Sequence, residues 1–459
     1  MTPVSNNYVK ALLKTVYLSG VANNKYQNSP VLSAIKKEDW GSGKEIKYAA
    51  QYGNGGNFGS VYNTLVNNPT SGVKNLEWTA TQGYATGFFE INQPEILTSA
   101  NERGAYMKVL ANKMAGTFDG MSKMLAMYLY GGSYGVIDQV KEDFTLAASN
   151  TISITSAGAL KLDVGSRFVI ASAGADNKAV PSSAVLNAIC TVTAMDDTTI
   201  TFSASVTGEN VYVGDYIELY TARVGNEARG IEGLCDILPA YFDRTGSDWE
   251  AYIGTDFRGV DRSVAASRLA GQFVKAGSGA TAKSDALVTL LKKGKRAGGL
   301  NDMLIVNDED WDKIGQELGI QTNLWQAVNE GGNKNSVTKG LSDLATAFGD
   351  AFISRTVIDP YCTEGKAYMF EKDDLSFYDL GNVSRVTDAV ANDQLGKHDI
   401  ESVGDQGLGD SFGPKLNMDK LFNIEQGTAG EYGPSMRISC NVFGAYVMRK
   451  TASSGVCSF

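Results

Sequence analysis

The stretch SANERGAYMKVLANKMAGTFDGMSKMLAMYLY, residues 99–130, decides the fold because it predicts a single long helix. Ser99 and Glu102 have the spacing of a capping box, and the pattern stops at Gly131 and Gly132. At about 1.5 Å per residue this helix is roughly 48 Å long. Apolar residues recur along it at steps of three or four: Met107, Leu110, Met114, Phe118, Met121, Leu125 and Tyr128. Such a one-sided stripe is typical of a helix packed on a core rather than of a metal-binding or promiscuous surface.

Two candidate strands precede this helix. They are KEIKYAAQY at 44–52 and LEWTATQGYATGFFEI at 76–91, and the segment between them contains GNGGNFG at 53–59. The glycines there read GxGxxxG, one residue out of register with the dinucleotide-binding fingerprint, and no βαβ pattern follows. The sequence therefore predicts a long two-stranded ribbon with a flexible tip rather than a nucleotide site.

The predicted ribbon carries the aromatic residues Trp78, Tyr84, Phe88 and Phe89. A two-stranded ribbon is marginally stable in water by itself. We therefore expect its strands to rest on something outside their own hairpin, and another subunit is the natural candidate. These four residues are the candidate intersubunit contacts.

A different pattern begins after the long helix. Apolar and small polar residues alternate between 145 and 221, which predicts an inserted β-barrel or sandwich. LDVGSRFVI at 162–170 and VYVGDYIEL at 211–219 share a Val-Gly followed by apolar residues two apart, which indicates paired strands. Asp196 and Asp197 predict a tight hairpin between two further strands. Since its acidic residues outnumber its basic ones, we do not expect this segment to bind phosphate.

The flanking chain reads as mixed α/β. Short helices are predicted at 7–18 and from Ser29-Pro30 to Ile35, where proline opens the helix. Later come a helix at 284–293, a buried strand at 303–307 and a helix that Asn307 caps. The remaining predicted elements are FISRTVIDP at 352–360, a hairpin-like KAYMFEKDDLSFYDL at 366–380 and a final strand MRISCNVFGAYVMRK at 436–450, and we expect these last elements to form one sheet.

Composition narrows the functional classes. The 459 residues are 43% hydrophobic and 20% charged, which is ordinary for a soluble globular protein, and no apolar run or signal sequence indicates a membrane or secretion. A net charge of −10 disfavours sequence-specific nucleic-acid binding. Five dispersed cysteines read as reduced thiols, and a single histidine, His398, leaves little material for catalysis. We expect no enzyme, no cofactor and no metal site.

Two charged clusters have simple structural explanations. A predicted helix ends in the cluster Lys292, Lys293, Lys295 and Arg296. The helix dipole favours cations at this end, so contact with DNA phosphates is not needed to explain the cluster. The acidic run of 308–312 begins the next helix, where carboxylates are favoured without a metal.

In their order these parts resemble the major capsid protein of tailed bacteriophages, which has the Hong Kong 97-type fold. The local similarities are LYGGSYG at 129–135 and GIEGLCDIL at 230–238, which look like two halves of a Gly-rich step, together with VIDPYCTEGKAYMFEKDDLSFYDLG at 357–381 and the closing strand. The resemblance implies an α+β chain with an N-terminal arm (1–43), an extended two-stranded loop (44–95), a spine helix of a peripheral domain (96–144), an inserted all-β domain (145–221), an axial α/β domain (222–355) and late strands completing both domains (356–459).

The resemblance also implies a function. The chain is expected to assemble as hexamers and pentamers into an icosahedral head shell around packaged viral double-stranded DNA, within the virion and after assembly in the bacterial cytoplasm. Implied partners are further copies of the chain, a separate scaffolding protein, a portal, and decoration or head-fibre proteins. The alternative is a phage or bacterial surface-binding protein whose β module recognises carbohydrate, which predicts clustered exposed aromatics on that module. An enzyme using carboxylate chemistry is a distant third.

Overall fold

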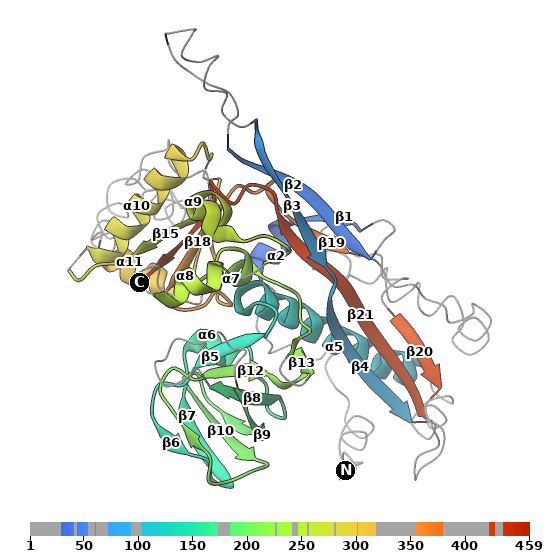
Figure 1. The fold of residues 1–459 in the computed structure, drawn as a ribbon. Helices are drawn as coiled ribbons and strands as arrows, with labels where there is room; N and C mark the ends of the chain where they lie inside the picture. Colours follow the sequence, from blue (N-terminus) through green and yellow to red (C-terminus); the bar gives the residue numbers. More distant parts are fainter. Residues whose placement is uncertain are drawn as a thin grey trace, which may run out of the picture.

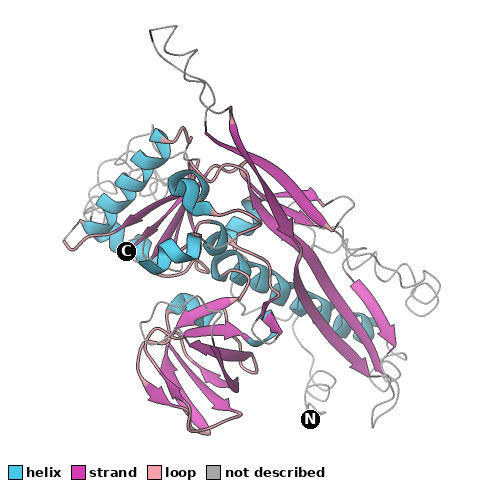
Figure 2. Cartoon of the chain, viewed as in Figure 1, coloured by secondary structure: helices cyan, strands magenta, loops and turns pink. Residues whose placement is uncertain are grey.

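The computed structural model describes residues 29–40, 44–53, 60, 72–92, 103–172, 184–224, 227–240, 247–254, 257–279, 281–300, 302–317, 355–379, 422–426 and 435–459. The predicted helix at 7–18, the first residues of the long helix, the ribbon tip and His398 lie outside these residues. Figures 1 and 2 show a mixed helix-and-sheet chain in which a long helix lies behind extended strands, with two further sheets to one side. No helix of the described residues is long and apolar enough to cross a membrane.

The long helix is α5, Arg103–Gly131, and it ends at the predicted glycines. Gly132 has a positive φ of 67°. A side chain at Gly131 would place its Cβ 2.2 Å from the carbonyl oxygen of Val136, and one at Gly233 would place it 1.9 Å from that of Tyr128. The helix therefore ends where glycines allow two neighbouring backbone segments to cross it closely.

One sheet lies along α5. It has the order β1 (Lys36–Asp39), β19 (Leu375–Asp379), β21 (Ser435–Met448), β20 (Phe422–Gln426), and β4 (Gly83–Asn92) also pairs with β21. The predicted short helix is confirmed as α2, Pro30–Ala34, with the Ser29 side chain accepting a hydrogen bond from the Leu32 amide. On β4, Ala85 is buried and a Cβ at Gly87 would contact Thr117 and Met121 of α5, so this face of the sheet packs on the helix.

The segment predicted as one strand at 76–91 is two strands. β3 (Lys74–Thr81) pairs with β2 (Glu45–Gly53) in the ribbon, whereas β4 joins the sheet on α5. The break falls at Gln82, because the chain there passes close to the Gly-rich segment 230–238. A Cβ at Gly83 would lie 2.5 Å from the Cα atom of Ile231. The ribbon itself is formed as predicted, with antiparallel pairing from Glu45 to Gly53.

A second sheet has the order β15 (Gln272–Lys275), β22 (Gly455–Ser458), β18 (Lys366–Phe370), β16 (Met303–Val306), β17 (Arg355–Ile358). Helices α10 (Ala282–Arg296) and α11 (Asp308–Glu317) lie beside it, as Figure 1 shows. The Asn307 side chain caps α11 by accepting a hydrogen bond of 3.0 Å from the Glu309 amide, as predicted.

The prediction that 366–380 forms a hairpin is wrong, and so is the single late sheet. β18 and β19 do not pair with each other; β18 pairs with β16 and β22, and β19 with β1 and β21. The four residues 371–374 carry the chain from one sheet to the other. Along the chain, four short elements precede β15: α7 (Leu234–Ile237), α8 (Ser247–Ile253), η2 (Arg262–Ala265) and α9 (Ala266–Leu269).

The β-rich unit is present and starts earlier than residue 145. Its main sheet has the order β5 (Val136–Gln139), β12 (Tyr216–Leu219), β8 (Arg167–Ser172), β9 (Ala184–Met195), β10 (Thr199–Ala204), β7 (Ser149–Ser153), and β6 (Phe144–Thr145) pairs with β11 (Asn210–Val211). A short helix, α6 (Ser156–Leu160), joins β7 to β8. The unit ends in η1 (Tyr220–Ala222), followed by a small pair of strands, β13 (Arg223–Val224) and β14 (Glu227–Ala228).

Both repeat-like stretches of this unit form paired strands, as predicted. β8 and β12 run antiparallel, and each follows a turn with a positive-φ glycine, Gly165 or Gly214. The Asp196 hairpin is also confirmed, since the Asp196 amide donates to the Thr199 carbonyl at 2.8 Å. The first strand, β5, pairs with the last, β12, so the unit leaves and rejoins the rest of the chain at one place.

Candidate assembly surfaces

The ribbon of β2 and β3 has two unlike faces. One face is apolar and turned toward the rest of the chain: Ile46, Tyr48, Ala50, Tyr52, Leu76, Trp78 and Ala80 are buried or half-buried. The opposite face is polar and exposed, and there Lys47 and Glu77 form an ion pair of 2.7 Å across the two strands. The ribbon therefore rests on its own body by one face and presents the other to solvent.

Trp78, one of the four candidate intersubunit contacts, is buried within its own chain. Its side chain is 3% exposed. The ring stacks on Tyr48 with centroids 6.2 Å apart and meets Phe257 edge-on at 6.0 Å, and Val260 and Leu269 belong to the same cluster. The ribbon is thus supported by the loop and helices of its own chain at this point, and Trp78 is covered without a second subunit. The sequence pattern identified the apolar face but not the surface that covers it.

Arg258 fastens the ribbon to the body, and sequence reasoning missed it. Its buried guanidinium donates to the Glu232 carboxylate at 2.6 Å, the Tyr48 hydroxyl at 3.0 Å and the Tyr446 carbonyl at 2.7 Å. Burial by itself lowers the pKa of Arg258, but the charge and hydrogen bonds of Glu232 and Tyr48 together outweigh it, so the pKa is raised. The Arg258 carbonyl also accepts from the Thr79 amide at 2.9 Å. One residue therefore links the ribbon, the Gly-rich segment and β21.

The Arg258 backbone has a positive φ of 52°, an uncommon conformation for a residue other than glycine. The neighbouring Gly259, also with positive φ, is the only sequence sign of a turn at this point. A glycine that indicates a turn does not indicate which distant carboxylate and carbonyl the Arg258 side chain will contact.

The outer face of β4 carries exposed aromatic side chains. Phe88 is 60% exposed and Tyr84 is 47% exposed, and both lie on the face away from α5. Tyr84 meets Phe443 of the adjacent β21 edge-on, with ring centroids 5.5 Å apart. Phe89 is half-buried on the opposite face. Of the four predicted contact residues, Tyr84 and Phe88 are thus placed on one outward-facing surface, which we call the β4 outer face.

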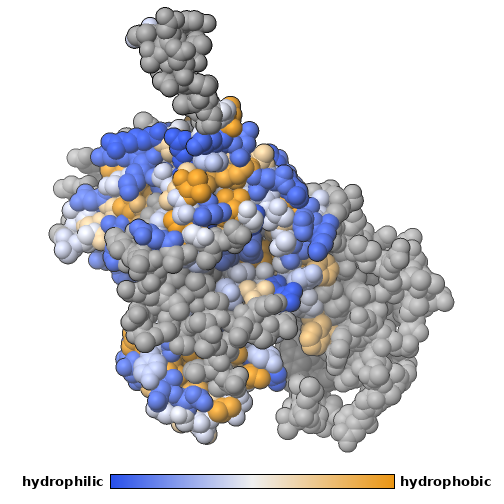
Figure 3. All heavy atoms as spheres, viewed as in Figure 1, coloured by the Kyte–Doolittle hydropathy of each residue, from blue (hydrophilic) through white to orange (hydrophobic). Residues whose placement is uncertain are grey.

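The space-filling view in Figure 3 shows apolar and charged areas side by side, with an apolar area over α9 beside the ribbon. In the adjoining η2, Val264 is 65% exposed. Exposed apolar side chains are thus found on the body next to the ribbon as well as on the β4 outer face.

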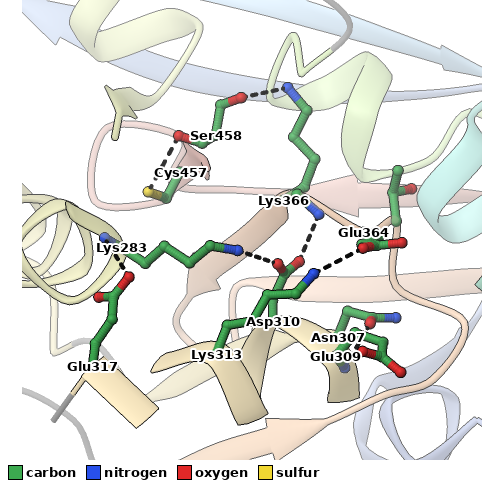
Figure 4. Close-up of polar contacts among 12 residues, drawn as sticks. Lys283, Asn307, Glu309, Asp310, Lys313, Glu317, Glu364, Lys366, Cys457 and Ser458 are labelled. Carbon is green, nitrogen blue, oxygen red and sulfur yellow. Dashed lines mark hydrogen bonds and ion pairs between the residues drawn. The ribbon is translucent and has the colours of Figure 1, made fainter. Parts of the chain in front are cut away.

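Several members of the two charged clusters make contacts within the fold around the second sheet. Lys293 donates to the Phe273 carbonyl at 2.9 Å and Lys295 to the Leu300 carbonyl at 3.1 Å. Asp310 is buried and pairs with Lys283 at 2.6 Å, as Figure 4 shows. It also accepts a hydrogen bond from the Gly365 amide at 2.6 Å. These contacts tie α10, α11 and the turn before β18 together. Within the described ranges no group of three or more His, Cys, Asp or Glu side chains is placed to hold a metal ion.

The β-rich unit has most of its described aromatic residues in its core. Phe168 and Phe202 are fully buried and meet edge-on with centroids 5.1 Å apart, and Tyr216 is 3% exposed. Tyr212 and Tyr220 are 55% and 37% exposed, and they lie beyond opposite ends of β12. The clustered aromatic platform expected of a carbohydrate-binding module is therefore not seen among the described residues.

The β-rich unit also packs on α5. Met127 of α5 belongs to the same apolar cluster as Ile137, Phe168 and Ile217. The ammonium group of Lys123, also on α5, donates to the Leu162 carbonyl at 3.1 Å. The β-rich unit is therefore seated directly on the last turns of the helix.

Comparison with solved structures finds similar chains over nearly the whole length. A cyanophage A-1(L) capsid chain is 14% identical with a TM-score of 0.49, and 99% of each chain is covered. The capsid of the myovirus XM1 is 9% identical with a TM-score of 0.39, covering 97% of this chain and 96% of that one. The capsid of an empty GTA particle is 8% identical with a TM-score of 0.41, covering 100% and 99%.

No protein-family model and no curated protein matches the chain. The three similar structures are capsids of two phages and of a GTA particle. Because their TM-scores lie below 0.5, we base the function on the chain's own geometry.

Proposed function

We propose that this chain is a major capsid protein of the Hong Kong 97 type, which assembles as hexamers and pentamers into an icosahedral shell around packaged double-stranded DNA. The observation that carries the proposal is the ribbon, whose apolar face is fixed to its own body at Trp78 and Arg258. A rigidly anchored arm with a polar outer face is able to reach a neighbouring subunit without first being ordered by it, which reduces the entropic cost of association.

The β4 outer face supplies a second contact surface. Exposed Tyr84 and Phe88 are aromatic residues of the kind enriched at protein interfaces. In a closed shell each contact is repeated many times, so none has to be strong by itself. Phe89 and Trp78, which face the chain's own interior, take no part in this proposed surface.

The remaining domains follow from the same proposal. α5 with the sheet of β1, β19, β21, β20 and β4 forms the peripheral domain, and the sheet of β15, β22, β18, β16 and β17 with α10 and α11 forms the axial domain. The net charge of −10 suits a wall that confines DNA without gripping it. The role is structural and non-enzymatic.

The β-rich unit is proposed to be an insertion that braces the capsomer or docks a partner. Its two ends meet, since a Cβ at Gly135 would lie 3.3 Å from the Cβ atom of Ala222. Insertions are tolerated where the ends of the host chain lie close together at a surface. We propose the junction at 135 and 222 rather than at 145 and 221, because β5 pairs with β12 of the same sheet.

We propose a separate scaffolding protein and a portal as further partners, with decoration or head-fibre proteins as optional additions to the shell. The chain should be expressed alone and with a phage scaffolding protein, and its sedimentation in a sucrose gradient should be followed by negative-stain microscopy. Rapidly sedimenting hollow shells are expected. Monomers or small discrete oligomers under every assembly condition would contradict the proposal and favour a surface-binding protein.

The role of the insertion requires a separate variant. Residues 136–221 are deleted and residues 135 and 222 are joined through a short linker. Impaired assembly or stability is expected of a brace, whereas normal shells of normal stability would leave the unit only an accessory binding role.

A further inference from the structure

The chain crosses between its two large sheets at two adjacent places. One crossing is the turn Glu371–Asp374 between β18 and β19, and the other is the segment 449–454 between β21 and β22. The two are hydrogen-bonded to each other, since the Arg449 amide donates to the Asp374 carbonyl at 3.1 Å. Within the first crossing, the Asp374 amide donates to the Glu371 carbonyl at 3.0 Å. Any change in the angle between the sheets must act on these crossings.

A cluster of three charged side chains bridges the crossings. The ammonium group of Lys450 lies 3.0 Å from a carboxylate oxygen of Glu371 and 3.6 Å from Oδ1 of Asp374. The other oxygen of Glu371 accepts from the Leu300 amide at 2.9 Å, which adds the loop after α10 to the cluster. Both carboxyl groups are buried, with side chains 8% exposed.

The remaining charged groups near the pair are few in the described part of the chain. Lys372 and Asp373 of the same turn are exposed, and Arg449 exerts a favourable field on Asp374. Among the described residues no donor reaches the buried Oδ2 atom of Asp374. A buried carboxylate oxygen without a donor is unfavourable, whereas a proton on that oxygen turns it into a donor.

The Glu371 carboxylate lies beside Asp374, since both carboxyl groups contact the ammonium group of Lys450. Burial, followed by the field of the Glu371 carboxylate, raises the pKa of Asp374 to about 6. Burial raises the pKa of Glu371, but the hydrogen bond from the Leu300 amide and the contact with Lys450 lower it. The lowering effects outweigh burial, so the pKa of Glu371 is lowered. Below about pH 6 Asp374 is therefore protonated and the pair carries one negative charge opposite Lys450. Above about pH 6 both carboxyl groups are charged.

We propose that Glu371, Asp374 and Lys450 form a proton-dependent clasp that holds the two sheets at a fixed angle when the carboxyl pair shares a proton and loosens when both carboxyls are charged. The clasp is a property of the single subunit, and its use in adjusting domain angles within a shell rests on the proposed function. Because Asp374 has a raised pKa in the fold, its stabilising effect is present at low pH and is lost as the pH rises through about 6.

The test is amide hydrogen exchange of unassembled full-length subunits, followed in peptides that contain Arg449 and Asp374. Exchange at pH 5 and pH 7.5 is compared after correction for the intrinsic pH dependence. If opening restores an ordinary carboxyl, linkage predicts about a tenfold loss of protection at the higher pH. Asp374→Asn, which keeps the shape of the neutral acid, should abolish this pH dependence. Asp373→Asn, in the same turn but exposed, should retain it.

Equal protection at both pH values in the wild type would overturn the clasp, and so would an Asp374→Asn variant that still responds to pH. Should that variant not fold, infrared spectra of the wild type decide instead. A carboxylic-acid band that disappears near pH 6 is expected, and a spectrum without any such band between pH 5 and 7 would refute the shared proton. Because no shell is needed, failure here leaves the proposed capsid function standing.

Discussion

Replacing Arg258 by alanine tests whether one buried cation fastens the ribbon to the body. The change removes a donor from Glu232, Tyr48 and the Tyr446 carbonyl, at 2.6, 3.0 and 2.7 Å. Removing one partner of a buried ion pair typically costs about 3–5 kcal/mol. Glu232 retains 27% exposure of its side chain and so remains partly hydrated, which places the expected loss of unfolding free energy at about 3 kcal/mol.

The assay is urea denaturation of unassembled subunits, with hydrogen exchange at the Thr79 amide, whose acceptor is the Arg258 carbonyl. Arg449→Ala is the matched control, because that arginine also bonds a tyrosine hydroxyl and a carboxylate but its side chain is 58% exposed. The control should lose less than about 1 kcal/mol. The reasoning is refuted if Arg258→Ala costs no more than the control and the Thr79 amide stays as protected as in the wild type.

Three further predictions concern the end of the spine helix, the second sheet and the β4 outer face. Gly233→Ala should lower the unfolding free energy by several kcal/mol or prevent folding, because its Cβ would stand 1.9 Å from the Tyr128 carbonyl oxygen; wild-type thermal stability would show this contact to be unimportant. Lys283→Met leaves the buried Asp310 without its cation and should cost about 3 kcal/mol in urea denaturation, and a cost below about 1 kcal/mol would contradict the pairing. Phe88→Ser should leave subunit stability within about 0.5 kcal/mol of the wild type but reduce the yield of sedimenting shells, and unchanged yield would remove Phe88 from the assembly surface.

The elements that local chemistry specifies could be predicted from the sequence. Ser29 followed by Pro30, Asn307 before an acidic first turn, and the Gly131-Gly132 pair each act within a few residues, and each has the predicted structural role. The similarity between 162–170 and 211–219 also predicted the correct strand pairing, because each stretch places a glycine turn before an apolar strand.

The errors arise where distant contacts decide the path of the chain. The break at Gln82 depends on the approach of Gly83 to Ile231, and the crossing at 371–374 depends on Lys450 and the Leu300 amide. The sequence around Gln82 does not indicate the contact with Ile231, and the sequence around 371–374 does not indicate the contacts with Lys450 and the Leu300 amide.

The same limit applies to the candidate surface. Alternation along β2, β3 and β4 separates their two faces, but it does not tell whether the chain itself or another subunit covers the apolar one. For Trp78 the chain itself does, through Phe257, Val260 and Leu269. Arg258 was overlooked because an arginine before a glycine in a loop carries no sign of the carboxylate that it will meet.

A cryo-electron microscopy reconstruction of the assembled protein tests the central claim most directly. We predict closed icosahedral shells of hexamers and pentamers, in which the polar face of each ribbon and the β4 outer face at Tyr84 and Phe88 contact neighbouring subunits. Discrete trimers or monomers, with the ribbon and the β4 outer face both open to solvent, would contradict the account.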